Sequence, residues 1–179
     1  MTNLNIGNGG QTPFTLEALI QLTNISSGTA QEIICTDNSQ TANSARGFQF
    51  RIISGGLNFQ FVGGPSPRAV NATIPTTGSD AFVAGTWYHV AAVYEGANIL
   101  LYWTKLDPAN GAAHQIGSGA MSLGTVEGAV QGPLIIGNEN RNNAGERFIG
   151  SIDEVRISSV ARAANQMQFY SPLVTITVQ

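Results

Sequence analysis

The stretch Phe148 to Val160, FIGSIDEVRISSV, is the segment of this chain that best indicates its fold. Apart from the adjacent acidic pair, apolar and polar residues alternate between Ile152 and Ile157, a pattern that an amphipathic helix does not keep. Because successive side chains of a strand point to opposite faces, the adjacent acidic residues Asp153 and Glu154 are expected on opposite faces. We interpret the stretch as a late central strand of a β-sandwich.

Other segments of the chain show the same alternation, separated by turn residues. Residues 14–22 form one such segment, and two hairpins are expected at 47–64 and 85–105, with turns at SGG and EGAN. Shorter strands are expected at 2–6, 32–37, 68–74, around Ile116, and at 121–126, 133–137 and 172–178, with one or two helical turns within 161–170. About a dozen strands with almost no helix predict an all-β antiparallel jelly-roll sandwich of two curved sheets, a single domain over residues 1–179.

The composition excludes several classes of protein. Charged residues make up 11% of the 179 positions, and the net charge of −3 argues against nucleic-acid binding, which needs clustered Lys and Arg. The sequence has no apolar run long enough for a membrane span. Cys35 is the single cysteine, so an intrachain disulfide is impossible, and a small buried hydrophobe is its expected role.

The start of the chain, MTNLNIGNGG, has neither the basic residues nor the apolar core of a signal peptide. The remaining sequence is rich in Gly, Asn and Thr and poor in charge, which suits an extracellular module better than a cytosolic enzyme. We therefore expect an extracellular or cell-surface module, cut from a longer secreted chain that supplies further domains.

Four segments, in this order, resemble one known family. They are PFTLEALIQL (13–22), GTWYHVAAVYEG (85–96), GPLIIGNE (132–139) and RFIGSIDEVRIS (147–158). Together they are similar to the laminin-G-like branch of the concanavalin A-like lectin/glucanase superfamily and cover essentially the whole chain. The resemblance implies a jelly-roll of two curved sheets, with a concave face often used for ligands, in a secreted or surface context. It implies no single activity, because this fold carries lectins, glycosidases and adhesion domains.

Three functions are compatible with this resemblance. A non-catalytic binding or adhesion module, with carbohydrate as its ligand, is our preferred prediction, and a structural module that spaces or oligomerises other domains is the alternative. A glycoside hydrolase is the third, and it needs two carboxylates facing one groove. The glucanase pattern Glu-x-Asp-x-x-Glu is absent from this sequence, so we predict that the chain is not an enzyme.

Candidate sugar-binding residues come from the two hairpins. An aromatic platform with polar neighbours would be supplied by Tyr102, Trp103, Tyr88, Arg51, Asn58 and Gln60. Aromatic residues in central strands also commonly belong to the core, which is the alternative for the first three. The polar face of the first hairpin must meet solvent, a groove or a covering loop. His89 lies among apolar neighbours and is expected to be a hydrogen-bonded core histidine.

Asp153 is the candidate metal ligand. Relatives with a C-terminal DxVRxY strand resemble SIDEVRI, and in them the aspartate helps to hold a structural Ca²⁺. Calcium takes six to eight oxygen ligands, many of them backbone carbonyls, so one carboxylate and nearby loops can form such a site. The alternative is that Asp153 pairs with an arginine such as Arg156 or Arg147, or accepts hydrogen bonds from loop N–H groups.

Overall fold

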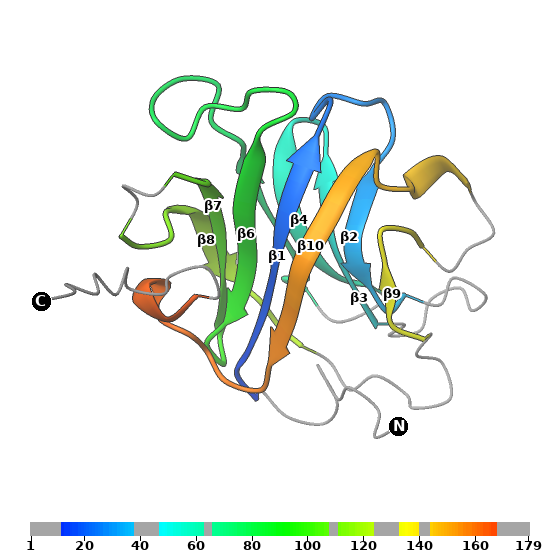
Figure 1. Cartoon of the computed structure of the whole chain (residues 1–179). Coiled ribbons are helices and arrows are strands. Elements are labelled where there is room, and N and C mark those ends of the chain that lie inside the picture. The colour runs from blue at the N-terminus through cyan, green and yellow to red at the C-terminus, as the bar shows by residue number, and fades with distance from the viewer. Residues whose placement is uncertain are drawn as a thin grey trace, which may run out of the picture.

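Two antiparallel sheets pack face to face in the computed structural model, which describes residues 12–37, 47–62, 66–107, 111–123, 133–139 and 144–167 (Figure 1). The first sheet has the order β10-β1-β6-β7-β8, with β10 (Gly150–Ser158), β1 (Phe14–Leu22), β6 (Trp87–Tyr94), β7 (Asn98–Lys105) and β8 (Gln115–Ala120). The second has the order β5-β4-β3-β2-β9, with β5 (Ala69–Thr73), β4 (Gly56–Val62), β3 (Gly47–Ile53), β2 (Gln31–Cys35) and β9 (Ile135–Ile136). Two short 3₁₀ turns, η1 (Ala144–Glu146) and η2 (Ala164–Gln166), complete the described elements.

The all-β sandwich and both hairpins are confirmed. The first hairpin, β3–β4, turns through Ser54 and Gly55, whose φ angles of 50° and 75° are those of a two-residue turn that matches the twist of the strands. Residues 121–123 are not a strand, and the helical composition after residue 161 gives only η2. The strands expected at 2–6 and 172–178 lie outside the described residues. No helix in the described part of the chain is long and apolar enough to cross a membrane.

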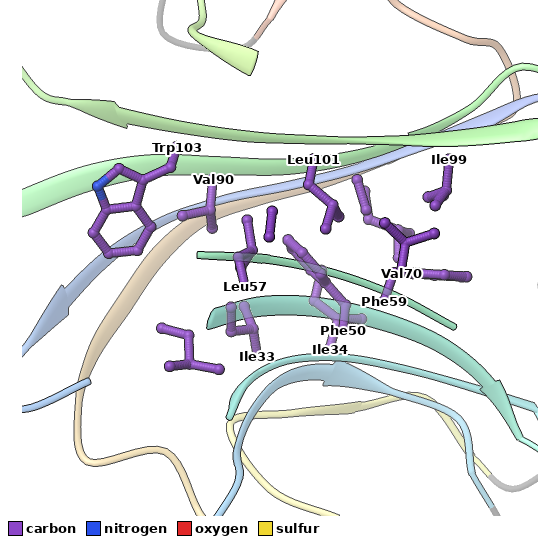
Figure 2. Packing of buried hydrophobic residues seen from close by; sticks show 14 of the residues in the cluster. Ile33, Ile34, Phe50, Leu57, Phe59, Val70, Val90, Ile99, Leu101 and Trp103 are labelled. Carbon is purple, nitrogen blue, oxygen red and sulfur yellow. The ribbon is translucent and has the colours of Figure 1, made fainter. Parts of the chain in front are cut away.

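The space between the sheets is filled by one apolar cluster. Alternate residues of every long strand point into it, as the labelled side chains of Figure 2 show for Phe50 and Phe59 on one side and Val90 and Leu101 on the other. All four of these side chains are fully buried. The period-two pattern read from the sequence is therefore the pattern of residues that face this cluster.

The stretch that indicated the fold was assigned to the wrong place in the sheet. Among the described strands β10 pairs with β1 alone and forms an edge, so the interpretation as a central strand is wrong. Its alternation is also interrupted, since a bulge places Glu154 at a φ of 50° opposite a shift in the β1 register. Ile152 and Val155 both pack on the core, and the residues between them, Asp153 and Glu154, are both exposed.

The segment after β10 folds back over the outer face of the first sheet. Arg162 donates its backbone N–H to the Thr15 hydroxyl, which in turn donates to the Val160 carbonyl at 2.8 Å. Beyond it, η2 lies near the C-terminal end of β6 (Figure 1), and Met167 packs with Ala91 and Tyr102 in a small second apolar cluster. This part of the outer face is therefore closed by the chain itself.

A substitution of Gly150, at the start of β10, tests how closely the edge strand approaches β1. A Cβ at this position would overlap the backbone carbonyl of Gln21, so we expect Gly150→Ala to lower the free energy of unfolding by about 1–3 kcal/mol. Urea denaturation measures the change, and Gly28→Ala is the matched control because nothing lies within 4 Å of the added Cβ. Equal effects of the two substitutions would contradict the described β1–β10 pairing.

Candidate functional site

Polar side chains form two cross-strand rows on the outer face of the second sheet. Strand register places Glu32, Arg51 and Asn58 opposite one another in the first row. The second row pairs Gln49 with Gln60. Because these rows alternate with the core-facing residues, the polar half of the β3–β4 hairpin forms one continuous surface across the sheet.

Arg51 is the centre of this surface. Its Nε donates to Asn58 Oδ1 at 3.1 Å, and one terminal nitrogen donates to Gln60 Oε1 at 2.8 Å. The other terminal nitrogen lies 3.5 Å from Glu32 Oε1 and 3.8 Å from Glu146 Oε2. We call these five residues the Arg51 cluster. Its members fix one another's rotamers, so the exposed groups at its margin are held in position.

Glu32 is fully buried at the β2 end of the Arg51 cluster. Burial raises the pKa of its carboxyl to about 9, against the lowering effect of the nearby Arg51, and the carboxylates of Glu146 and Glu139 raise it further. A side-chain hydrogen bond joins Glu32 to Glu146, which requires that one of the two carboxyls carries a proton. The raised pKa therefore favours a protonated Glu32 carboxyl at neutral pH.

The opposite end of the surface, toward β5, is open. Asn58 is buried and donates to the Val70 carbonyl at 3.1 Å, and Asn71, which lies opposite Asn58 across β4–β5, is exposed. Gln60 is half-buried. The Gln60 amide nitrogen and the Asn71 side chain make no hydrogen bond to another described residue. At the β2 end, the polar surface is therefore occupied by the contact between buried Glu32 and Arg51. At the β5 end, these amide groups have no hydrogen-bond partner among the described residues.

The three predicted aromatic residues do not join this surface. Trp103 and Tyr88 are fully buried between the sheets, with ring centroids 4.4 Å apart, and Trp103 Nε1 donates to the Asp80 carbonyl. Tyr102 faces the other side of its sheet, where Met167 covers it. The prediction that these side chains present a platform to a ligand is wrong, because central strands of a sandwich are covered on both faces. Arg51, Asn58 and Gln60 are the predicted residues that the fold brings together.

Asp153 is exposed on the bulge of β10, and its Oδ1 accepts the backbone N–H of Glu154 at 2.8 Å. This contact is the backbone hydrogen bond that the sequence offered as the alternative to calcium. No group of three or more His, Cys, Asp or Glu side chains in the described ranges is placed to hold a metal ion. Most ligands of a calcium ion at Asp153 would therefore have to be backbone carbonyls, and the metal role stays a prediction.

A buried ion network on the first sheet was not predicted from the sequence. Glu17 of β1 is fully buried; its carboxylate accepts Arg156 Nε at 2.6 Å and lies 3.1 Å from His89 Nε2. Burial lowers the pKa of His89, which agrees with the expected role of a hydrogen-bonded core histidine. The alternation of 14–22 places Glu17 on the polar face of β1, which is the only sign of this network in the sequence. The network could not be predicted from it, because the partners of Glu17 lie on two other strands.

A second unpredicted pair joins Asp80 to His114. Asp80 Oδ2 lies 2.5 Å from His114 Nδ1, and Asp80 Oδ1 accepts the backbone N–H of Lys105 at 2.9 Å. Because the Asp80 carbonyl also accepts the Trp103 indole N–H, this residue ties the loop after β5 to the β7 strand. Its role is structural, and nothing local in the sequence around residue 80 distinguishes it from other loop aspartates.

With this fold and surface, the chain belongs to the concanavalin A-like lectin/glucanases superfamily, whose laminin G family model matches residues 2–168. No curated protein matches it in sequence. A carbohydrate-binding module of the Ruminococcus gnavus IT-sialidase, CBM40, solved with α2,3-sialyllactose, superimposes with a TM-score of 0.59 at 12% identity. That match covers 86% of this chain and 79% of the module.

Two further similar structures are of longer chains. The mouse laminin α1 chain, domains LG4-5, gives a TM-score of 0.54 at 13% identity, over 84% of this chain and 38% of the laminin chain. The binding domain of botulinum neurotoxin serotype D gives 0.56 at 15% identity, over 87% of this chain and 36% of the toxin chain. This chain thus spans under two fifths of both. At these identities the likeness shows the fold, which the sequence resemblance had predicted.

The proton held by Glu32 predicts how stability depends on pH. The folded state keeps this proton up to about pH 9, whereas an unfolded glutamate loses it near its ordinary pKa of 4.5. The stabilisation is complete below pH 4.5, and the free energy of unfolding is expected to fall as pH rises between these values, by up to ~1.4 kcal/mol per pH unit. Glu32→Gln keeps the hydrogen bond without the proton and is expected to flatten this slope between pH 7 and 9.

Urea denaturation at several pH values measures the slope, with Glu95→Gln as the control because Glu95 is exposed. The lowered pKa of His89 affects stability in a separate pH range. Below about pH 6.5 the histidine is protonated more readily in the unfolded state than in the folded state, so the free energy of unfolding falls. A slope between pH 7 and 9 that persists in Glu32→Gln would show that another group holds the proton.

Proposed function

We propose that this chain is a non-catalytic binding module and that its ligand is a carbohydrate. Membership of a superfamily of lectins and glucanases supports a role in binding, and so do the similar structures, which are a carbohydrate-binding module, laminin LG domains and the binding domain of a neurotoxin. One of them was solved with a bound sialyllactose. The proposal also places the chain in an extracellular or cell-surface protein with further domains.

The observation that carries the proposal is the open end of the Arg51 cluster. Sugar hydroxyls need donors and acceptors held in fixed positions, and binding sites supply a few such groups on a rigid scaffold. Gln60 Oε1 is fixed by Arg51 at 2.8 Å, so its unused N–H₂ group points from a defined position. Asn71 lies two strands from Arg51 and offers both a carbonyl and an N–H₂ group. These amides project from strands rather than from loops.

The carboxylates of this surface support binding rather than hydrolysis. A retaining glycosidase holds its two carboxyl groups about 5 Å apart and an inverting one about 6.5–9.5 Å apart, with the substrate between them. Glu32 and Glu146 are instead in direct hydrogen-bond contact, and Glu32 has no exposed surface. A sugar therefore has no space between these two groups.

A structural module is the second candidate, and a specific observation favours it. Arg51 donates three of its five N–H groups to Asn58, Gln60 and Glu32, so most of its hydrogen bonds are made within the protein. A module that only spaces other domains would use the Arg51 cluster as a buried network and leave Gln60 and Asn71 solvated. The two candidates differ in whether these two residues contact a ligand.

A glycan array distinguishes the candidates. The wild type is expected to bind one glycan class, and Gln60→Ala or Asn71→Ala to weaken this binding by about tenfold, the effect of losing one or two hydrogen bonds to a ligand. Asn98→Ala is the matched control, since Asn98 is an exposed asparagine on the other sheet. A blank array with folded wild type, or binding unaffected by both substitutions, would contradict the proposed site.

Calcium at Asp153 is tested separately by linkage. If the exposed carboxylate contributes to a structural Ca²⁺ site, calcium at one hundred times its Kd stabilises the fold by about 2.7 kcal/mol. The melting temperature is then expected to rise on replacing chelator with Ca²⁺ and to be independent of calcium in Asp153→Ala. If wild type melts equally with chelator and with calcium, Asp153 acts through its hydrogen bond to Glu154 alone.

A further inference from the structure

Trp87, the first residue of β6, differs from every other aromatic residue in the described part of the chain. Each of the others belongs to one of the two apolar clusters or packs against one, whereas Trp87 does neither. Its ring makes no stacking contact with another aromatic ring in the described ranges, and its indole N–H donates to no described residue. A large half-buried side chain at the surface thus contributes little to the core.

The strand register shows what surrounds this indole. On the outer face of the first sheet Trp87 lies directly opposite Gln21 of β1, which lies opposite Ser151 of β10. On the other side Leu106 donates its backbone N–H to the Trp87 carbonyl, and its side chain is 38% exposed. We call these four residues the Trp87 row. With strands about 4.8 Å apart, the row extends about 10 Å from the indole to the serine.

The polar groups of the Trp87 row are oriented and unused. Gln21 Nε2 donates to the Gly85 carbonyl at 2.7 Å, which fixes the amide and leaves Oε1 without a described partner. Ser151 is exposed, and its hydroxyl has no described partner either. Beside the indole, the row therefore offers an acceptor, a hydroxyl and the indole N–H as a donor. Figure 1 shows that η2 covers the other end of this face, near the C-terminal end of β6.

This combination fits the chemistry of a pyranose ring. One face of such a ring carries C–H groups that pack on an indole, whose negatively polarised π face attracts them, and its rim carries hydroxyls that need donors and acceptors. Charge selects among sugars. Asp153 follows Ser151 by two residues on the same edge strand and is exposed, while Arg156 is engaged by buried Glu17. A negatively charged margin favours neutral sugars over acidic ones.

We propose that the Trp87 row is a second carbohydrate site, one that takes the apolar face of a neutral pyranose. It lies on the opposite side of the sandwich from the Arg51 cluster, since the two sites occupy the outer faces of different sheets. The inference extends the proposed function to a second surface and requires no ligand at the Arg51 cluster. Two sites on opposite faces would let one module bridge two glycan chains.

Intrinsic fluorescence reports on this site directly, because Trp103 is fully buried and Trp87 is the other tryptophan of the chain. The probes are neutral gluco-, galacto-, manno- and xylo-oligosaccharides, with α2,3-sialyllactose titrated in parallel. At least one neutral probe is expected to change the emission of the wild type. Trp87→Ala is expected to weaken its binding about tenfold or more, and Trp87→Phe, which keeps an aromatic face, to weaken it less.

Calorimetry measures the affinities of the variants, and thermal melting verifies that each is folded. Asn98→Ala, an exposed residue at the far end of the β6–β7 hairpin from Trp87, is the control and is expected to leave neutral-sugar binding unchanged. The proposal is overturned if no neutral probe binds, or if folded Trp87→Ala binds as tightly as wild type. Neutral-probe binding that is lost in Gln60→Ala but kept in Trp87→Ala would assign the neutral sugar to the Arg51 cluster and refute the Trp87 row.

Discussion

The apolar layer between the two sheets is the constraint on which the rest of this structure depends. It contains fully buried aromatic side chains from both sheets, among them Phe50, Phe59 and Trp103, and their removal from water is the main driving force that holds the sheets together. Because alternate residues of the strands point into this layer, the other residues of each strand must lie on one of the two outer faces. The polar chemistry of the protein is therefore divided between two surfaces on opposite sides of the sandwich.

Glu17 on the outer face of the first sheet and Glu32 on that of the second are both fully buried, and the two are stabilised differently. The Glu17 carboxylate lies against the Arg156 guanidinium and beside His89, and because burial lowers the pKa of His89, the arginine is the main compensating charge. Glu32 shares Arg51 with Glu146, so one cation faces two carboxylates, and a bound proton supplies the missing compensation. A buried charge is tolerated only with such compensation, which explains why both networks reach across several strands.

Closure of the outer faces decides which residues can meet a ligand. On the first sheet, the segment after β10 covers Tyr102 and leaves the start of β6 uncovered by described elements, so that Trp87 rather than Tyr102 presents an aromatic surface. On the second sheet, the β2 end is buried and the β5 end is open at Gln60 and Asn71. Both open regions lie on regular strands, whose hydrogen-bonded ladders hold the exposed groups in place.

The sequence by itself determined the class of fold and the facing of most residues, because period-two alternation is a local property of a strand. It correctly placed Arg51, Asn58 and Gln60 on one face of the first hairpin, since successive side chains of a strand point to opposite faces. Tertiary structure alone decided that β10 is an edge, that the bulge exposes both Asp153 and Glu154, and that Trp103 belongs to the core. These outcomes depend on contacts between strands far apart in the chain, and no local pattern records which strands become neighbours.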